Sequence, residues 1–199
     1  MFSPKFTELV QALRCLPSVG HKSAQRMALH LLERDRKGAM ALSQVIEQAL
    51  KVIGRCDQCR ILTESSRCSV CLDSTRNIKQ LCIVESPTDW IAIEQSGAYE
   101  GLYFLLTGRL SPLDGIGPNE IGINELKKRL EHSPVEEIII AISATLEGAA
   151  TTTYIMDMLK NQPYKITRLA QGIPMGGELE YLDSHTLSLA LKSRREIED

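Results

Sequence analysis

The sequence of 199 residues lacks any long apolar run. Its longest aliphatic stretch is IIIAI at 138–142, whereas a membrane-spanning helix needs about 20 apolar residues. Residues 1–20 also lack the basic segment followed by an apolar segment that marks a secretory signal. These absences argue against an integral membrane protein, and we expect a cytoplasmic protein with no membrane partner. In that compartment we expect the six cysteines to be metal ligands or free thiols rather than disulfides.

Internal repeats and low-complexity segments are also absent, and so is a strong net charge. The charge is unevenly distributed, however. Residues 1–79 contain 13 Lys/Arg and 7 Asp/Glu (net +6), residues 80–199 contain 10 and 18 (net −8), and the two values sum to −2. A basic first third joined to an acidic remainder favours an anionic partner for the front of the chain.

The spacing of apolar residues changes once along the chain. Helical spacing predicts three helices in the first part, at 6–13, 24–31 and 41–54. From residue 80, four short apolar strands alternate with helical patterns; the strands are expected at 80–85, 102–107, 136–143 and 164–170, and the helices at 88–97, 123–132 and 149–161. This alternation predicts an α/β unit with a mainly parallel sheet. A last helix is expected at 185–195.

The segment between these two parts contains a paired cysteine motif. Its spacing is Cys56-x2-Cys59-x8-Cys68-x2-Cys71. Two such pairs can converge tetrahedrally on one Zn²⁺ ion, and four protein ligands leave no open position, so we expect one structural zinc per chain. An iron–sulfur cluster and a redox dithiol pair remain alternatives. Cys15 and Cys82 lie within apolar patterns and are expected in the core.

The stretch LPSVGHKSAQRMALHLL at 16–32 joins the first two predicted helices through a tight turn. It resembles a helix–hairpin–helix motif, in which backbone N–H groups at the start of the second helix bind a phosphate. Gly20, Lys22, Ser23 and Arg26 are the predicted DNA-binding residues, in a sequence-tolerant and salt-dependent contact. The motif usually has glycine where this chain has Ser18, so we expect a turn that is harder to form. A plain helical hairpin packed in a core is the alternative.

Two predicted strand ends carry acidic residues. Glu85 follows the first strand, and Ser143-Ala144-Thr145-Leu146-Glu147-Gly148 follows a later one. The pairing resembles the Toprim domain of topoisomerases and DnaG-type primases, whose catalytic members hold Mg²⁺ with a glutamate and an Asp-x-Asp pair. Ser143 and Thr145 occupy the two aspartate positions, and neutral hydroxyls are poor Mg²⁺ ligands. We therefore predict a non-catalytic Toprim domain; a metal-dependent nuclease, primase or topoisomerase is the alternative.

A glycine-rich loop at 111–125 separates two of these elements. It contains neither GxxxxGK[ST] nor GxGxxG, because its spacing is Gly115-x-Gly117-x4-Gly122. We expect it to serve packing or subunit contact; a zinc-containing nucleotide-binding regulator is a minor alternative.

The order of these motifs resembles the RecR family of bacterial recombination mediators. The resemblance covers essentially the whole chain, through the hairpin, CDQC…CSVC, IVESPTDWIAIEQSG, LSPLDGIGP and GGELEYLDSHTL. It implies ring-like oligomers, commonly tetramers, that encircle or clamp DNA. It also implies action with RecO, and with RecF at single-strand/double-strand junctions. Together they would help to load RecA onto gapped DNA coated by single-strand binding protein.

We accordingly predict an α+β chain of several modules. They are a helix–hairpin–helix region at 1–54, a four-cysteine zinc finger at 55–78, a Toprim-like domain at 79–175 and a C-terminal oligomerisation tail at 176–199. We further hypothesise that Glu85 and Glu147 form an acidic docking face for RecO, because charge complementarity favours a basic partner there.

Overall fold

The structure is a computed structural model that describes residues 2–194 and 196. The chain divides into two compact units, 1–54 and 55–199. Within the described residues, no helix is long and apolar enough to cross a membrane. The division predicted at the ends of the zinc finger and of the Toprim-like domain stays a prediction. Of the predicted tail, residues 195 and 197–199 lie outside the described residues.

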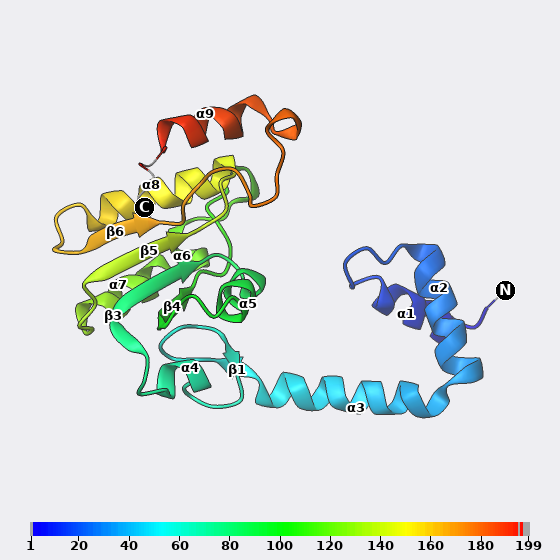
Figure 1. The fold of residues 1–199 in the computed structure, drawn as a ribbon. Helices are drawn as coiled ribbons and strands as arrows, with labels where there is room; N and C mark the ends of the chain where they lie inside the picture. The colour runs from blue at the N-terminus through cyan, green and yellow to red at the C-terminus, as the bar shows by residue number, and fades with distance from the viewer. Residues whose placement is uncertain (1, 195, 197–199) are drawn as a thin grey trace. The chain divides into compact units, whose positions relative to one another are not determined.

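The first unit is entirely helical, as its apolar spacing predicts (Figure 1). It contains α1 (Pro4–Leu13), α2 (His21–Leu29), a π-helical turn (His30–Arg34) and α3 (Arg36–Val52). Ser3 caps α1 by accepting from the backbone N–H of Phe6, and Asp35 caps α3 by accepting from that of Gly38. α1 and α2 bury a small common core of Phe6, Val10, Ala24 and Ala28.

Helix α3 contributes no buried residue to this core. Its apolar stripe, predicted from the helical spacing, is present but remains exposed, with Val45 61%, Ile46 50% and Leu50 80% accessible. Apolar side chains of this size are usually covered, so the stripe is an exposed apolar surface of the first unit.

The second unit is built on a four-stranded parallel sheet in the order β4-β3-β5-β6. The strands are β3 (Asn77–Val84), β4 (Gly101–Leu105), β5 (Glu137–Ala141) and β6 (Lys165–Arg168). Val84 pairs with Leu105 on one side and Ala141 on the other, so the carboxyl ends of β3, β4 and β5 lie together. The predicted parallel sheet is confirmed.

Side chains of β3 alternate between the two faces of the sheet, as strand geometry requires. Leu81 and Ile83 belong to a core with three helices, α6 (Pro118–Ile121), α7 (Ile123–Glu131) and α8 (Leu146–Leu159). Cys82 and Val84 belong to a second core. It is covered by α5 (Pro87–Gln95) and by the cysteine module, which we define as residues 55–78.

The cysteine module has little regular structure of its own. Before β3 begins at Asn77, its regular structure is β2 (Leu62–Thr63), which pairs with β1 (Gly54–Arg55), and one turn of helix, α4 (Ser69–Leu72). Ile61 and Val70 of the module are buried in the core it shares with the sheet. Packing against the sheet therefore supports its fold, in addition to any metal.

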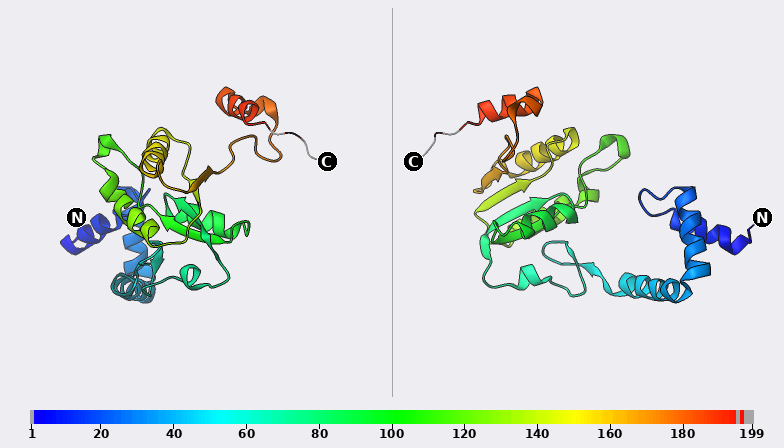
Figure 2. Two further views of the ribbon diagram at one scale, coloured as in Figure 1. Left: turned by 90° about the vertical axis from the view of Figure 1, so that its left-hand side faces the viewer. Right: turned by 45° about the vertical axis from the view of Figure 1, so that its right-hand side comes forward.

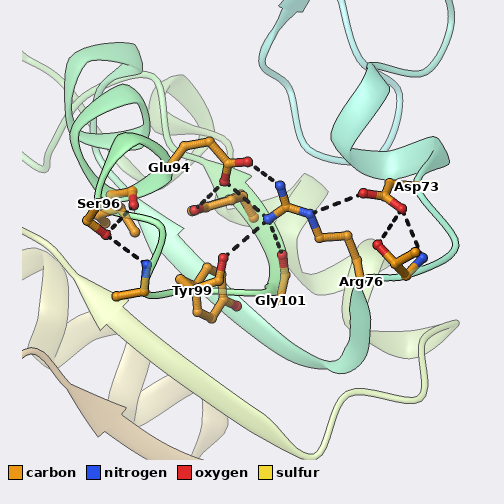
Figure 3. A network of polar contacts seen from close by, with 10 residues as sticks. Asp73, Arg76, Glu94, Ser96, Tyr99 and Gly101 are labelled. Carbon is orange, nitrogen blue, oxygen red and sulfur yellow. Dashed lines mark hydrogen bonds and ion pairs between the residues drawn. The ribbon is translucent and has the colours of Figure 1, made fainter.

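Arg76, at the end of the cysteine module, ties the module to α5 through Glu94 and to β4 through the Gly101 carbonyl (Figure 3). Its guanidinium forms a two-point ion pair with Glu94, at 3.1 Å from Nη1 to Oε2, and also donates to the carbonyl of Tyr99. Tyr103 Oη donates to the same carboxylate at 2.8 Å. Hydrogen bonding from Arg76 holds the pKa of Glu94 below its usual range.

The two cysteines outside the motif differ in environment. Cys82 is 1% exposed, as predicted, and burial raises the pKa of its thiol to about 12. The prediction for Cys15 is wrong, because this side chain is exposed. Helix α1 ends at Leu13, so Cys15 lies in the turn beyond the helix and off its packed face.

The tail after β6 reaches α9 (Ser184–Lys192) through a long segment that contains a short 3₁₀ turn, Leu179–Tyr181. Helix α9 follows at the end of this segment (Figure 2), and its Leu189 lines a pocket together with Ile140 of β5 and Met156 of α8. No residue of α9 is buried, and Met175 and Tyr181 are 103% and 78% exposed. The helix was predicted through residue 195, but Arg195 lies outside the described residues.

Candidate functional site

The four cysteines of the paired motif converge at one point. Their sulfur atoms all lie within 4.8 Å of one another, and Cys59 Sγ is 3.4 Å from Cys68 Sγ. Tetrahedral Zn–S bonds of about 2.3 Å place sulfur atoms about 3.8 Å apart. The backbone N–H of Cys68 also points at Cys56 Sγ, at 3.3 Å. The donor set thus fits a metal ion, and the cluster could bind one.

The electrostatics of the cluster favour thiolate at one position. A hydrogen bond from Cys59 lowers the pKa of Cys71 to about 6, and the charge of Arg129 acts in the same direction. Burial raises the pKa of Cys68, and the hydrogen bond to Cys71 raises that of Cys59. Sulfur atoms crowded this closely share protons when no cation is bound, and a divalent ion would replace those protons.

The predicted DNA-binding residues lie together at the start of α2. Gly20 is its N-cap residue, and no side chain caps this helix end. Lys22, Ser23 and Arg26 follow within two turns and are all exposed. Ser23 and Arg26 also border an open groove of about 560 Å³, lined mainly by apolar residues of the three helices. The arrangement offers N–H groups, a hydroxyl and two cationic side chains to one anion.

Ser18 forms the expected turn at a conformational cost. Its φ is +65°, in the left-handed region that favours glycine. For a residue with a Cβ this costs roughly 1–2 kcal/mol. The motif's usual glycine therefore has a physical reason, and this chain forms the turn without it.

The second candidate site is the carboxyl edge, which we define as Glu85, Ser143, Thr145 and Glu147. Ser143 Oγ donates to Glu85 Oε1 at 2.7 Å. Among the described residues the other carboxylate oxygen, Oε2, is buried without a hydrogen-bond partner. The structure therefore brings Ser143 and Glu85 together, as the strand ends predict.

Thr145 has a structural role at this edge. Its hydroxyl caps α8 by accepting from the backbone N–H of Gly148 at 3.1 Å, and it accepts from Arg109 Nη1 at 3.3 Å. Gly148 is required here because a Cβ at that position would lie 2.0 Å from the carbonyl oxygen of Ser143. These two hydrogen bonds use both acceptor lone pairs of the hydroxyl oxygen, so this oxygen is poorly placed to bind a cation.

Glu147 lies in the first turn of α8 and is half-buried. Over residues 2–194 and 196, the four cysteines form the one group of three or more potential ligands that lie within reach of a common ion. Among these residues, no third carboxylate, histidine or cysteine is placed to complete a metal site with Glu85 and Glu147.

Two arginines with specific contacts at these sites were not anticipated from the sequence. Arg109 reaches Thr145 at the carboxyl edge, and Arg60 reaches from the cysteine module to the carbonyl of Ile121 at 2.9 Å. No local pattern marks either residue, since their partners lie 36 and 61 positions away in the chain.

Comparisons with known families match three segments. A RecR helix-hairpin-helix model matches residues 6–50, a Toprim domain model matches 79–170, and a RecR C-terminal model matches 172–195. The chain is 55% identical over 197 residues to recombination protein RecR of Saccharophagus degradans, covering 99% of this chain and 100% of that protein. It is 55% identical to that of Acinetobacter baylyi, with 98% of each covered. The RecR of Methylococcus capsulatus is 53% identical, with 95% of this chain and 96% of that protein covered.

Proposed function

Because the chain belongs to the RecR family of recombination proteins, we propose that it is a DNA-binding mediator of recombinational repair at gapped DNA. The observation that carries this proposal is the α1–α2 hairpin. Its second helix begins at His21 after the N-cap residue Gly20, which offers no side-chain cap, and exposed Lys22 and Arg26 flank that start. Phosphate contacts of this kind position a protein on DNA without reading its sequence.

The mediator is proposed to work without catalysis. Ser143 and Thr145 stand where catalytic Toprim domains carry aspartates, and both hydroxyls are engaged in hydrogen bonds within the chain. Phosphodiester chemistry of the Toprim type needs Mg²⁺ held against the reacting phosphate. Two glutamates alone make a weak site for such an ion.

The metal in the cysteine cluster is proposed to be one structural Zn²⁺ per chain. Four thiolates in a tetrahedral arrangement suit zinc and leave no position for substrate or water. When bound, the ion would cross-link both ends of the cysteine module, and Cys56, Cys59, Cys68 and Cys71 would hold it.

The chain is proposed to form a homo-oligomer, a tetrameric ring by family resemblance. The exposed stripe of α3 supports this, since Val45, Ile46 and Leu50 leave a large apolar surface uncovered. An Ile46→Glu variant is expected to lower the molar mass measured by light scattering, whereas Lys51→Glu on the same helix is the control. An unchanged mass for Ile46→Glu would argue against α3 as a subunit contact.

RecO is the proposed partner of the carboxyl edge, with RecF acting at single-strand/double-strand junctions and RecA loading as the outcome. Glu85 and Glu147 place negative charge at this edge, which suits a basic partner. Glu85→Ala and Glu147→Ala should each weaken RecO binding while leaving the fold intact, as judged by circular dichroism. Full affinity in both variants would contradict this assignment.

A plasmid gel tests the proposed function as a whole. Supercoiled DNA is incubated with the protein and Mg²⁺ or Mn²⁺ over a salt series, and half of each sample is deproteinised. A native shift that fades with salt, together with unchanged topology after deproteinisation, supports a non-catalytic DNA-binding protein. Nicked, relaxed or linear product would instead establish a metal-dependent enzyme.

A further inference from the structure

The turn between Cys56 and Cys59 places one arginine in an unusual backbone conformation. Arg60 directly follows Cys59 and has a φ of +66°, in the left-handed region. Its backbone N–H donates to the Cys56 carbonyl at 2.9 Å, which closes the turn around the two sulfur atoms. A non-glycine residue is disfavoured in this region, so the surrounding contacts must hold it there.

The Arg60 side chain crosses from the cysteine module to the sheet. Nη1 donates to the Ile121 carbonyl at 2.9 Å, and Nη2 donates to Thr107 Oγ1 at 3.4 Å. The guanidinium also lies 5.8 Å from the ring centroid of Phe104. Gly122, with φ +89°, leaves space for this approach, because a Cβ there would lie 1.3 Å from Nη1.

The Ile121 carbonyl and Thr107 Oγ1 lie near the two ends of the glycine-rich segment, which we define as residues 107–122. We call these adjoining ends the base of the segment. The base is closed by the backbone N–H of Thr107 donating to the Ile121 carbonyl at 3.1 Å. Thr107 Oγ1 also donates to the Glu120 carbonyl at 2.8 Å. The Arg60 guanidinium donates to both residues of this closure, Thr107 and Ile121. Hydrogen bonds that involve a charged group are stronger than those between neutral groups.

The segment carries groups that reach outward. Leu113 is 100% exposed, and Arg109 donates to Thr145 at the carboxyl edge. The position of the segment therefore affects the surface at the ends of β3 and β5.

We propose that metal binding by Cys56 and Cys59 fixes the glycine-rich segment 107–122 through the guanidinium of Arg60. With the metal bound, the turn from Cys56 to Cys59 keeps a single conformation. Arg60 then retains its left-handed backbone conformation, and its guanidinium remains in contact with the segment base. Without the metal, Arg60 relaxes to a favoured φ and withdraws its guanidinium from Ile121. Arg60 is a positioning residue, and the inference rests on the proposed metal site.

Hydrogen exchange of the full chain tests this, read by mass spectrometry on peptides from the segment. Wild type is compared before and after metal removal by a chelator, with β3 peptides as an internal reference. Arg60→Gly deletes the guanidinium and suits the backbone, since glycine adopts a positive φ freely. Arg67→Gly removes an exposed arginine of the same module, one position before Cys68, and is the matched control.

Exchange in the segment is expected to rise about tenfold in metal-depleted wild type and equally in metal-bound Arg60→Gly, as one charged hydrogen bond predicts. Removing metal from Arg60→Gly should add little, and Arg67→Gly should behave as wild type. If the segment in metal-bound Arg60→Gly exchanged as slowly as in wild type, the proposal would be overturned. The same holds if metal removal from Arg60→Gly raised exchange in the segment by about a further tenfold. An equal rise in β3 on metal removal would overturn it as well.

Metal content, measured by mass spectrometry on each sample, separates two kinds of failure. If purified wild type holds no metal, the proposed metal site and this inference fail together. If metal is present but its removal leaves the segment protected, only the coupling through Arg60 fails.

Discussion

The Ser143 hydroxyl donates a hydrogen bond of 2.7 Å to Glu85 across the ends of the adjacent strands β5 and β3. A carboxylate at position 143 would instead face Glu85 as a like charge, and a cation would be needed between them. The hydroxyl instead supplies a proton to Glu85 Oε1, so this contact needs no cation.

Placing aspartates at both hydroxyl positions should create a response to divalent cations. We expect Ser143→Asp combined with Thr145→Asp to lower Tm in the absence of metal, because the new carboxylate at 143 replaces the hydroxyl that donates to Glu85 and repels it. Added Mg²⁺ should recover a few degrees, as ligand binding to the folded state predicts. The measurement is Tm with and without Mg²⁺ for wild type, the double variant and Thr153→Asp, which lies on the exposed part of α8. A variant that responds to Mg²⁺ no more than Thr153→Asp does would contradict the expectation.

Lys22 and Arg26 should account for part of the salt dependence of DNA binding. Each alanine substitution is expected to weaken binding to all sequences alike and to reduce the slope of log K against log salt by about 0.9. Fluorescence anisotropy with two unrelated duplexes over a salt series measures both effects. Lys5→Ala is the control, because this exposed lysine lies on α1 and is paired with Glu8. An unaltered slope in both variants would remove the hairpin from the DNA interface.

Replacing Ser18 by glycine should stabilise the hairpin. The left-handed conformation at this position is free of steric cost for glycine, although glycine also increases the entropy of the unfolded chain. We expect a net gain of up to about 1 kcal/mol in the free energy of unfolding, measured by urea denaturation. Ser23→Gly, within helix α2, should instead destabilise by a similar amount. A loss of stability in Ser18→Gly would show that the turn is not strained.

Removing one ligand should abolish metal binding and destabilise the cysteine module locally. Cys59→Ser is expected to hold no zinc and to lower the free energy of local opening of the module by on the order of 4 kcal/mol, since loss of a structural metal is among the largest single-residue effects. Metal content and hydrogen exchange of peptides from the module measure the two results. Cys15→Ser changes an exposed cysteine outside the cluster and should alter neither. Retention of stoichiometric zinc in Cys59→Ser would contradict a four-cysteine site.

The Arg76–Glu94 pair should make stability depend on pH in the acid range. The pKa of Glu94 is held below its ordinary value of 4.5, mainly by Arg76. The pair therefore contributes fully above pH 4.5, and its contribution is lost as pH falls through the lower folded pKa. Glu94→Gln should cost about 2 kcal/mol at neutral pH, because Arg76 is largely buried, and the difference from wild type should shrink below about pH 4.5.

Thermal unfolding between pH 3 and 7 measures this difference, with the exposed Glu100→Gln as a control of equal charge change. A constant difference between wild type and Glu94→Gln over that range would show that the carboxylate charge is not involved.

The sequence by itself determined the elements and the chemistry of the sites. Periodicity of two or 3.6 residues is local, so it predicted the helices of the first unit and the parallel strands of the second. The spacing of Cys56, Cys59, Cys68 and Cys71 fixed their convergence, because short connections leave few ways to arrange two cysteine pairs. That Ser143 and Thr145 carry hydroxyls rather than carboxylates was likewise evident, because residue identity is read directly from the sequence.

Only the tertiary structure decided which apolar faces are buried and which residues they pack against. Periodicity shows that Ile46 and Leu50 share a face of α3, but not that both side chains are exposed. For the same reason Cys15 is exposed although its neighbours are apolar. Contacts such as Arg60 with Ile121 join residues 61 positions apart, and such pairs depend on how the sheet and the cysteine module pack. Local sequence cannot specify them, because they exist only after the chain has folded.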